Sequence, residues 1–146
     1  MVSGIDPSVL RAAREKAGLT QHELARLVGA AGGERISRWE LGASVPRPGF
    51  LVKLARALDI PTLRLIHMEG GVPDLRALRL KAGLTVPELA AAVNVAVPTY
   101  YAWEQGRWTR LPAARQLESL ARGLGDTADV VAAAFQEARQ QRLRRG

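Results

Sequence analysis

The side chains of this sequence that could do chemistry are above all guanidinium groups. Of the 21 basic residues, three are lysines and the other eighteen are arginines, and the formal net charge is +7. A guanidinium donates hydrogen bonds from a planar fork that matches phosphate oxygens and the edge of a guanine. A small protein with this charge is therefore expected to bind nucleic acid. Composition by itself leaves a second interpretation open, in which the abundant alanine and arginine reflect a GC-rich genome.

Catalytic and metal chemistry find little support in the sequence. There is no cysteine, and the two histidines, His22 and His67, are far apart. Without thiolates, metal-ligand spacing, a nucleophile beside a base or a phosphate-cradling loop, we predict no metal, no cofactor and no enzymatic activity. No apolar run approaches the roughly twenty residues that span a bilayer, and the N-terminus lacks the apolar core of a signal peptide. We expect a cytoplasmic, nucleoid-associated protein without a membrane partner.

The chain contains two copies of one unit. Residues 10–20 return almost unchanged as residues 75–85. Further matches follow in the same order, with offsets of 65 at Thr20 and Thr85, 64 at Trp39 and Trp103, and 66 at Leu54 and Leu120. Single-residue changes of length between matching landmarks are typical of duplicated domains. The Glu-Gly-Gly-Val-Pro segment at 69–73 is the junction, so we predict domains at 1–70 and 71–146.

Helix signals recur at matching places in the two copies. A Thr-x-x-Glu capping box is expected at residues 20–23 and again at 85–88. Gly18 and Gly83 are expected to end the helix before each box. A final helix is expected from about Thr127. Together these signals predict a run of short helices in each copy.

Apolar residues at helical spacing supply the expected buried stripes, and alternating strand patterns are absent. In the first copy the stripes are Val9, Leu10, Ala13 and Ala17; Leu24, Leu27 and Val28; and Leu51, Leu54, Ala55 and Leu58. In the second copy they are Leu117, Leu120, Ala121 and Leu124, followed by Val130, Val131, Ala134, Phe135 and Ala138. The predicted fold class is all-α.

Three spaced motifs of the first copy carry a family resemblance. They are Leu-Thr-Gln-x-Glu-Leu-Ala at 19–25, Ile-Ser-x-Trp-Glu-x-Gly at 36–42, and Leu-x-x-Leu-Ala at 51–55 after Pro46. Both copies resemble the Cro/phage-repressor helix-turn-helix domain, also called the Xre family, over about residues 8–66 and 74–124. The resemblance implies two tandem five-helix domains like that of lambda repressor. It also implies that double-stranded DNA is the partner, with the third helix of a domain in the major groove.

The resemblance also implies which residues of the first copy face DNA. Gln21 opens the second helix and is expected to contact a phosphate or a base. Arg35 and Arg38 can serve phosphates or guanine, and Ser37 can donate to phosphate. The complete expected set is Gln21, His22, Glu34, Arg35, Ser37, Arg38 and Arg47. The alternative is that these arginines form only a solvated helix face.

A glutamate after each tryptophan has a structural interpretation. In the family this glutamate pairs with an arginine of the first helix, and the matching pairs here are Arg14 with Glu40 and Arg79 with Glu104. We interpret both as partly buried structural ion pairs, with no catalytic or base-reading role. Trp39 and Trp103 are likewise expected to pack in the core.

The two copies differ where they would meet DNA. The turn at 29–34 is rich in glycine and one residue longer than usual, which leaves the register of the following helix open. The second copy has the usual turn length at 94–99, but its second helix opens with Val86 and Pro87. The base-reading positions of the second copy fall on Val97, Pro98 and Ala102. Such side chains can touch a thymine methyl group but cannot hydrogen-bond a base edge.

The second copy still offers polar and aromatic residues near the same surface, namely Thr99, Tyr101, Arg107, Trp108 and Arg110. We favour the interpretation that it grips phosphates and positions the first copy, which reads sequence. The other interpretation is a dimerisation or partner-binding module. Two interpretations are also open for the basic segment 139–145, which either contacts phosphates, including as a groove-inserting arm, or complements a helix dipole.

The predicted function is a sequence-specific transcriptional regulator, with a host, phage or plasmid repressor as the default. The alternatives are an antitoxin, an excision factor and a protein-interaction adapter. A homodimer is a further partner to consider, and a palindromic binding site would indicate it.

Overall fold

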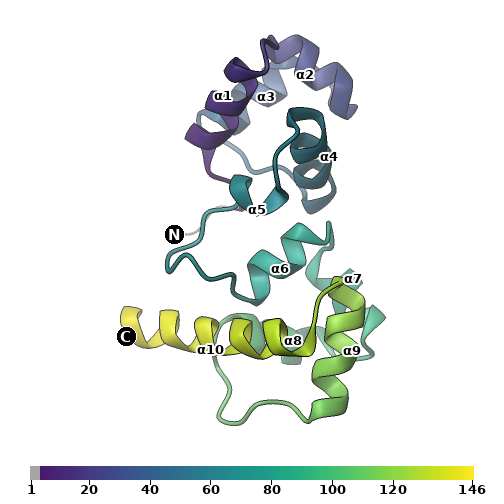
Figure 1. Ribbon diagram of the computed structural model, residues 1–146, viewed down its shortest axis with the longest axis vertical. Coiled ribbons are helices and arrows are strands. Elements are labelled where there is room, and N and C mark those ends of the chain that lie inside the picture. Colours follow the sequence, from purple (N-terminus) through teal and green to yellow (C-terminus); the bar gives the residue numbers. More distant parts are fainter. Residues whose placement is uncertain (1–3) are drawn as a thin grey trace. The chain divides into compact units, whose positions relative to one another are not determined.

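The computed structural model describes residues 4–146, and within that range all regular structure is helical (Figure 1). The chain divides into two units, the first ending at His67 and the second beginning at Met68. The helices of the first unit are α1 (Pro7–Lys16), α2 (Gln21–Val28), α3 (Gly33–Glu40), α4 (Pro48–Leu58) and α5 (Thr62–Leu65). Those of the second unit are α6 (Leu75–Lys81), α7 (Val86–Ala92), α8 (Val97–Glu104), α9 (Ala114–Leu124) and α10 (Ala128–Arg145). The predicted all-α fold of two five-helix domains is confirmed.

Side chains cap the first two helices of the first unit. The Asp6 carboxylate accepts from the backbone N–H groups of Ser8 and Val9 at 3.2 and 3.4 Å. At α2, Thr20 Oγ1 accepts from the Glu23 N–H at 3.0 Å, and Glu23 accepts from the Thr20 N–H at 2.8 Å. These are donors that a helix N-terminus otherwise leaves without an intrahelical partner. The predicted capping box at 20–23 is therefore confirmed, as is its counterpart at 85–88.

The core of the first unit is closed by one large aromatic and several aliphatic side chains. Its fully buried members are Ile5, Leu10, Leu24, Ile36, Trp39, Leu51, Leu54 and Leu65. Two members of the predicted stripes are exposed, namely Ala17 and Leu27, the latter at 62%. Successive helix residues are about 100° apart, and the buried side of α2 is formed by Leu24, Ala25 and Val28. That arrangement turns Leu27 towards solvent, so its assignment to the stripe was wrong.

The second unit is built around its long last helix. The helix α10 contacts α6, α8 and α9, and it buries Val131, Ala134, Phe135 and Ala138. The Phe135 ring lies 5.4 Å from the Trp103 ring, with an angle of 62° between the planes. Edge-to-face geometry of this kind stabilises aromatic pairs. The core of the second unit therefore depends on α10 as well as on α6–α9.

The basic segment at the C-terminus is helical. Residues 139–145 form the last turns of α10. Arg139 lies over the ring of Trp108, Arg144 bonds Glu137 at 2.9 Å, and Arg145 bonds Glu69 at 2.9 Å. These contacts favour the helix-end interpretation of the segment over a groove-inserting arm.

The segment that opens the second unit lies against α10. Besides the Arg145–Glu69 pair, a Cβ atom added at Gly70 would lie 2.7 Å from a carboxylate oxygen of Glu137. The boundary between the units lies between His67 and Met68, a few residues before the boundary after residue 70 that the sequence led us to expect.

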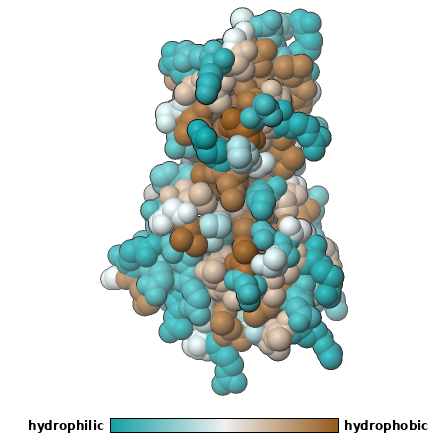
Figure 2. All heavy atoms as spheres, in the orientation of Figure 1, coloured by the Kyte–Doolittle hydropathy of each residue, from teal (hydrophilic) through white to brown (hydrophobic). Residues whose placement is uncertain are grey.

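Polar and apolar residues are interspersed on the visible face of each unit (Figure 2). Over residues 4–146, no helix is both long and apolar enough to cross a membrane.

Candidate nucleic-acid interface

Two glycines shape the turn between α2 and α3. Gly29 ends α2 with φ at +75°, a left-handed conformation that favours glycine. At Gly33 the reason is space, because a Cβ atom would lie 2.9 Å from the backbone nitrogen of His22. The first turn of α3 therefore abuts the first turn of α2, and only glycine permits so close an approach.

The structure determines the register of the two third helices. Asn94 takes the left-handed position in the second unit with φ at +56°, as Gly29 does in the first. The next N–H donates to the helix in the same way in both units, from Ala30 to the Ala25 carbonyl and from Val95 to the Ala90 carbonyl, both at 2.9 Å. The extra residue of the first turn thus falls after Ala30.

Beyond that residue, α3 and α8 correspond position by position. Both have eight residues, and α8 begins 64 positions after α3, at Val97 against Gly33. Ile36 and Tyr100 occupy the same position and are both fully buried. The longer turn therefore changes the connection without rotating the third helix.

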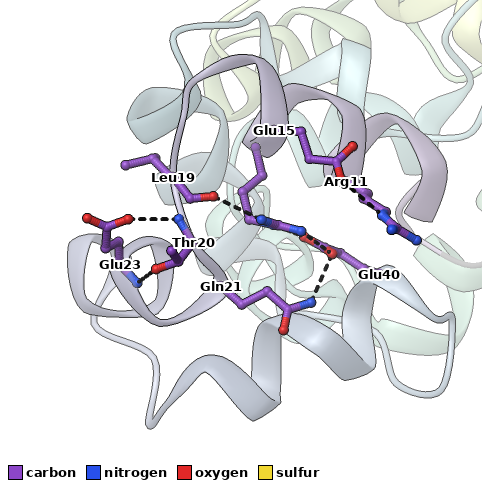
Figure 3. Close-up of polar contacts among 8 residues, drawn as sticks. Arg11, Glu15, Leu19, Thr20, Gln21, Glu23 and Glu40 are labelled. Carbon is purple, nitrogen blue, oxygen red and sulfur yellow. Dashed lines mark hydrogen bonds and ion pairs between the residues drawn. The ribbon is translucent and has the colours of Figure 1, made fainter.

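A four-residue hydrogen-bond cluster ties α3 to α1 and α2 (Figure 3). Arg14 donates to both carboxylate oxygens of Glu40, at 2.5 and 3.1 Å, and to the Leu19 carbonyl at 2.9 Å. Gln21 Nε2 donates to the same carboxylate at 3.1 Å. The Arg14 and Glu40 side chains are only 12% and 3% exposed. The hydrogen bond to Glu40 raises the pKa of Arg14, so the arginine stays charged. The resulting ion pair joins the end of α3 to α1.

The second unit repeats this cluster with one change. Arg79 donates to Glu104 at 2.5 and 3.2 Å and to the Leu84 carbonyl at 3.0 Å. Val86 stands where Gln21 stands in the first unit, and the Tyr100 hydroxyl supplies the third donor at 2.8 Å. Burial and the charge of Glu104 raise the pKa of Tyr100, so its hydroxyl stays protonated and donates.

Sequence reasoning missed the role of Tyr100. A signal was present, because a tyrosine replaces Ile36 in the very copy that lacks the glutamine. The expected contact of Gln21 with DNA stays a prediction; in the structure its amide nitrogen donates to Glu40 at 3.1 Å.

Four residues of the first unit that were expected to contact DNA line one open hollow, namely Glu34, Arg35, Arg38 and Arg47. Trp39, Ser44 and Phe50 are among the other residues that line it. Glu34, Arg35 and Arg38 are exposed on α3, and Arg47 is exposed immediately before α4. The hollow lining does not include the other three expected residues, of which Gln21 and Ser37 are half-buried and His22 is exposed.

Comparison with protein families supports the geometry in both halves. Residues 10–65 match a family model described as helix-turn-helix, and residues 74–134 match one described as helix-turn-helix domain. The chain is a tandem helix-turn-helix protein. No curated protein and no solved structure matches it. Paired domains of this kind indicate a DNA-binding regulator.

The second domain of this tandem helix-turn-helix protein brings fewer polar groups to its third helix. Thr99 and Tyr101 are exposed on α8, and Arg107 and Arg110 are exposed in the loop that follows. Trp108 differs from these, because its ring packs edge-on to Phe135 at 6.0 Å and lies under Arg139. Its indole N–H is buried without a hydrogen-bond partner. The contacts of Trp108 therefore make it a packing residue of the second core.

Within residues 4–146, the tandem helix-turn-helix protein has no cluster of three or more histidine and carboxylate side chains that could hold a metal ion.

Proposed function

We propose that the protein is a sequence-specific regulator of transcription that binds double-stranded DNA. In this proposal α3 enters the major groove and reads bases, while the second domain grips phosphates. The observation that carries it is the convergence of Arg35, Arg38 and Arg47 on one exposed hollow at the helix-turn-helix of the first domain. Among the described residues none of these three arginines forms a salt bridge, so their donors face solvent and are free to meet a ligand.

The chemistry of α3 suits base reading. A guanidinium can bond the O6 and N7 atoms of guanine together, and a carboxylate such as that of Glu34 can accept from the amino group of cytosine. Arg47, outside α3, suits a phosphate, because contacts to the backbone orient a domain without reading sequence. The Arg14–Glu40 pair supports this division by holding α3 against α1.

The proposal gives the second domain a positioning role. Arg107 and Arg110 are exposed beside α8 and suit phosphate contacts, and Thr99 supplies a hydroxyl donor. Both described units have a DNA-binding fold, and occupancy of a DNA site by such domains can by itself exclude other proteins from that site. We therefore propose a repressor.

The experiment that tests the proposal selects duplexes from a random-sequence library with the full chain and measures their affinity and salt dependence. Arg35→Ala and Arg38→Ala should each weaken binding to the selected duplex about tenfold or more, with a smaller effect on random DNA. Arg47→Ala should weaken both about equally and reduce the salt slope by about one. Arg64→Ala is the matched control, because Arg64 is an exposed arginine of the same domain on α5, away from α2 and α3 (Figure 1).

Two results would contradict the proposal. If the chain showed no salt-sensitive binding to DNA, the adapter interpretation would replace it, because contacts to phosphates release counterions and make binding depend on salt. If Arg107→Ala with Arg110→Ala abolished sequence preference and the α3 variants did not, the roles of the two domains would be reversed.

A further inference from the structure

The exposed side of α8 is chemically unlike that of α3. Positions that carry Glu34, Arg35 and Arg38 in α3 carry Pro98, Thr99 and Ala102 in α8. Val97 and Tyr101 are 43% and 48% exposed. Because the opposite side of α8 buries Tyr100 and packs Trp103 on Phe135, this helix is apolar nearly all round. A helix of that kind is usually covered on every side.

The charges around α8 indicate what covers its outer side. Arg107 and Arg110 are exposed directly after the helix. The Glu104 carboxylate of α8 accepts hydrogen bonds from Arg79 and Tyr100 on the inner side of the helix. At the start of the preceding helix, the Glu88 carboxylate is turned back on the Thr85 N–H at 2.8 Å. Val97, Pro98 and Tyr101 thus form an apolar strip with arginines beside it, and the nearby carboxylates are already hydrogen-bonded. Such a surface complements a polyanion that displays apolar groups.

The major groove of DNA displays one apolar group, the methyl on C5 of thymine. Resting on the proposed function, and adding base reading to the positioning role of the second domain, we propose that α8 reads pyrimidine C5-methyl groups through Val97, Pro98 and Tyr101. Thymine supplies this methyl in unmodified DNA, and 5-methylcytosine supplies the same group in methylated DNA. Contact with a methyl selects a base without any hydrogen bond, which suits a reading helix that has few donors and acceptors.

The spacing of the strip suits this reading. Val97 and Tyr101 are four positions apart and therefore lie on the same side of α8, about 6 Å apart along its axis. Successive base pairs are about 3.4 Å apart. The strip therefore spans about two base-pair steps, which is enough for neighbouring methyl groups.

The test uses duplexes selected from a random-sequence library with the full chain, then remade with single thymines replaced by deoxyuridine. This change removes only the methyl group and keeps every hydrogen-bonding atom. At the thymines that α8 contacts, we expect affinity to fall about fourfold per methyl, which corresponds to about 0.8 kcal/mol. Replacing cytosine by 5-methylcytosine in the same duplexes forms a second arm. A gain there without a loss in the deoxyuridine arm identifies methylated cytosine as the source of the methyl.

Variants of the chain assign the effect to α8. Val97→Ser and Tyr101→Ser should weaken binding to the thymine duplex and remove most of the difference between thymine and deoxyuridine. Val72→Ser is the matched control, because Val72 is a valine of the same unit, 45% exposed and outside the helix-turn-helix. It should leave both affinities unchanged. Helical circular dichroism checks that all three variants fold.

The outcomes separate this proposal from the proposed function. Equal affinity for thymine, deoxyuridine and 5-methylcytosine duplexes, with binding still dependent on Arg35 and Arg38, overturns methyl reading alone. Loss of self-association in Val97→Ser or Tyr101→Ser with an unchanged footprint also overturns it, because α8 would then be a protein interface. Failure of the wild-type chain to bind any selected duplex contradicts the proposed function itself.

Discussion

The Tyr100 hydroxyl donates to Oε2 of Glu104 at 2.8 Å and replaces a bond that Gln21 Nε2 makes to Glu40 at 3.1 Å in the other domain. Each buried carboxylate is thus satisfied by an arginine and one further side chain. The further donor comes from α2 in the first domain and from the third helix itself in the second. The two domains reach the same hydrogen-bonded state from different sequence positions.

Tyr100→Phe should destabilise the second domain. The change removes a hydroxyl that bonds a buried charge, and such bonds contribute about 1.5–3 kcal/mol. Chemical denaturation followed by circular dichroism measures the loss. Tyr101→Phe is the control, since that neighbouring tyrosine is 48% exposed, and it should change stability little. Equal losses in both variants would show that the Glu104 bond does not stabilise the domain.

Arg14→Met should destabilise the first domain by about 3–5 kcal/mol, because it leaves the Glu40 carboxylate buried without its charge partner. Adding Glu40→Leu should recover part of that loss. Arg11→Met on the same helix is the matched control, since the Arg11–Glu15 pair is more than half exposed and such pairs contribute about 0–1 kcal/mol. A shift of base preference in Arg14→Met, with stability unchanged, would argue against a structural role.

Gly33→Ala should push α3 away from α2. The new Cβ atom would lie 2.9 Å from the His22 backbone nitrogen, and backbone cannot yield as a flexible side chain does. Overpacking of this kind costs about 1–3 kcal/mol, and the displaced α3 should bind the selected duplex more weakly. At Gly49 in α4 a Cβ atom meets nothing within 4 Å, so Gly49→Ala should be neutral or slightly stabilising. An unchanged melting temperature and affinity in Gly33→Ala would refute the close approach.

Asp74→Asn should stabilise the second domain at neutral pH. Burial raises the pKa of Asp74, which caps α6 through the Ala77 N–H at 2.8 Å. A raised folded-state pKa means that stability is lost as pH rises through it, because the folded state disfavours the charge. Asparagine caps helices about as well as aspartate and carries no charge. Denaturation between pH 3 and pH 7 should show the advantage of the variant growing as pH rises, and a constant difference would contradict this.

Glu88→Gln should destabilise the second domain at neutral pH, whereas Asp74→Asn should stabilise it. The hydrogen bond from the Thr85 N–H lowers the pKa of Glu88, so its contribution is present above the unfolded-state pKa and is lost as pH falls. The variant should be less stable than the wild type at pH 7 and approach it in acid. Thermal melts across the same pH range measure this, and a deficit that persists at pH 3 would rule out the charge as its cause.

Local signals in the sequence predicted much of the fold. The capping boxes at Thr20 and Thr85 and the apolar stripe at 51–58 that α4 buries were all recognisable, because caps and helical periodicity depend on residues a few positions apart. The duplication identified the second domain even where its chemistry differs from that of the first.

The exposure of Leu27 and the packing of Trp108 were beyond such reasoning, because both depend on which elements meet. Leu27 faces solvent because Leu24, Ala25 and Val28 form the buried side of α2. Trp108 packs against Phe135 and Arg139, which lie on α10, a helix that follows much later in the chain.

The sequence by itself determined that this is a pair of helix-turn-helix domains rich in arginine, with an arginine–glutamate pair in each. The helices follow from local periodicity and capping and the second domain follows from the repeat, whereas the helix-turn-helix assignment and the two ion pairs follow from motifs that resemble the Xre family. The tertiary structure decided that Arg35, Arg38 and Arg47 surround one hollow and that Tyr100 replaces Gln21 as a donor. Such relationships join residues of separate helices or depend on which side of a helix is buried. They exist only once the hydrophobic core has brought those helices together.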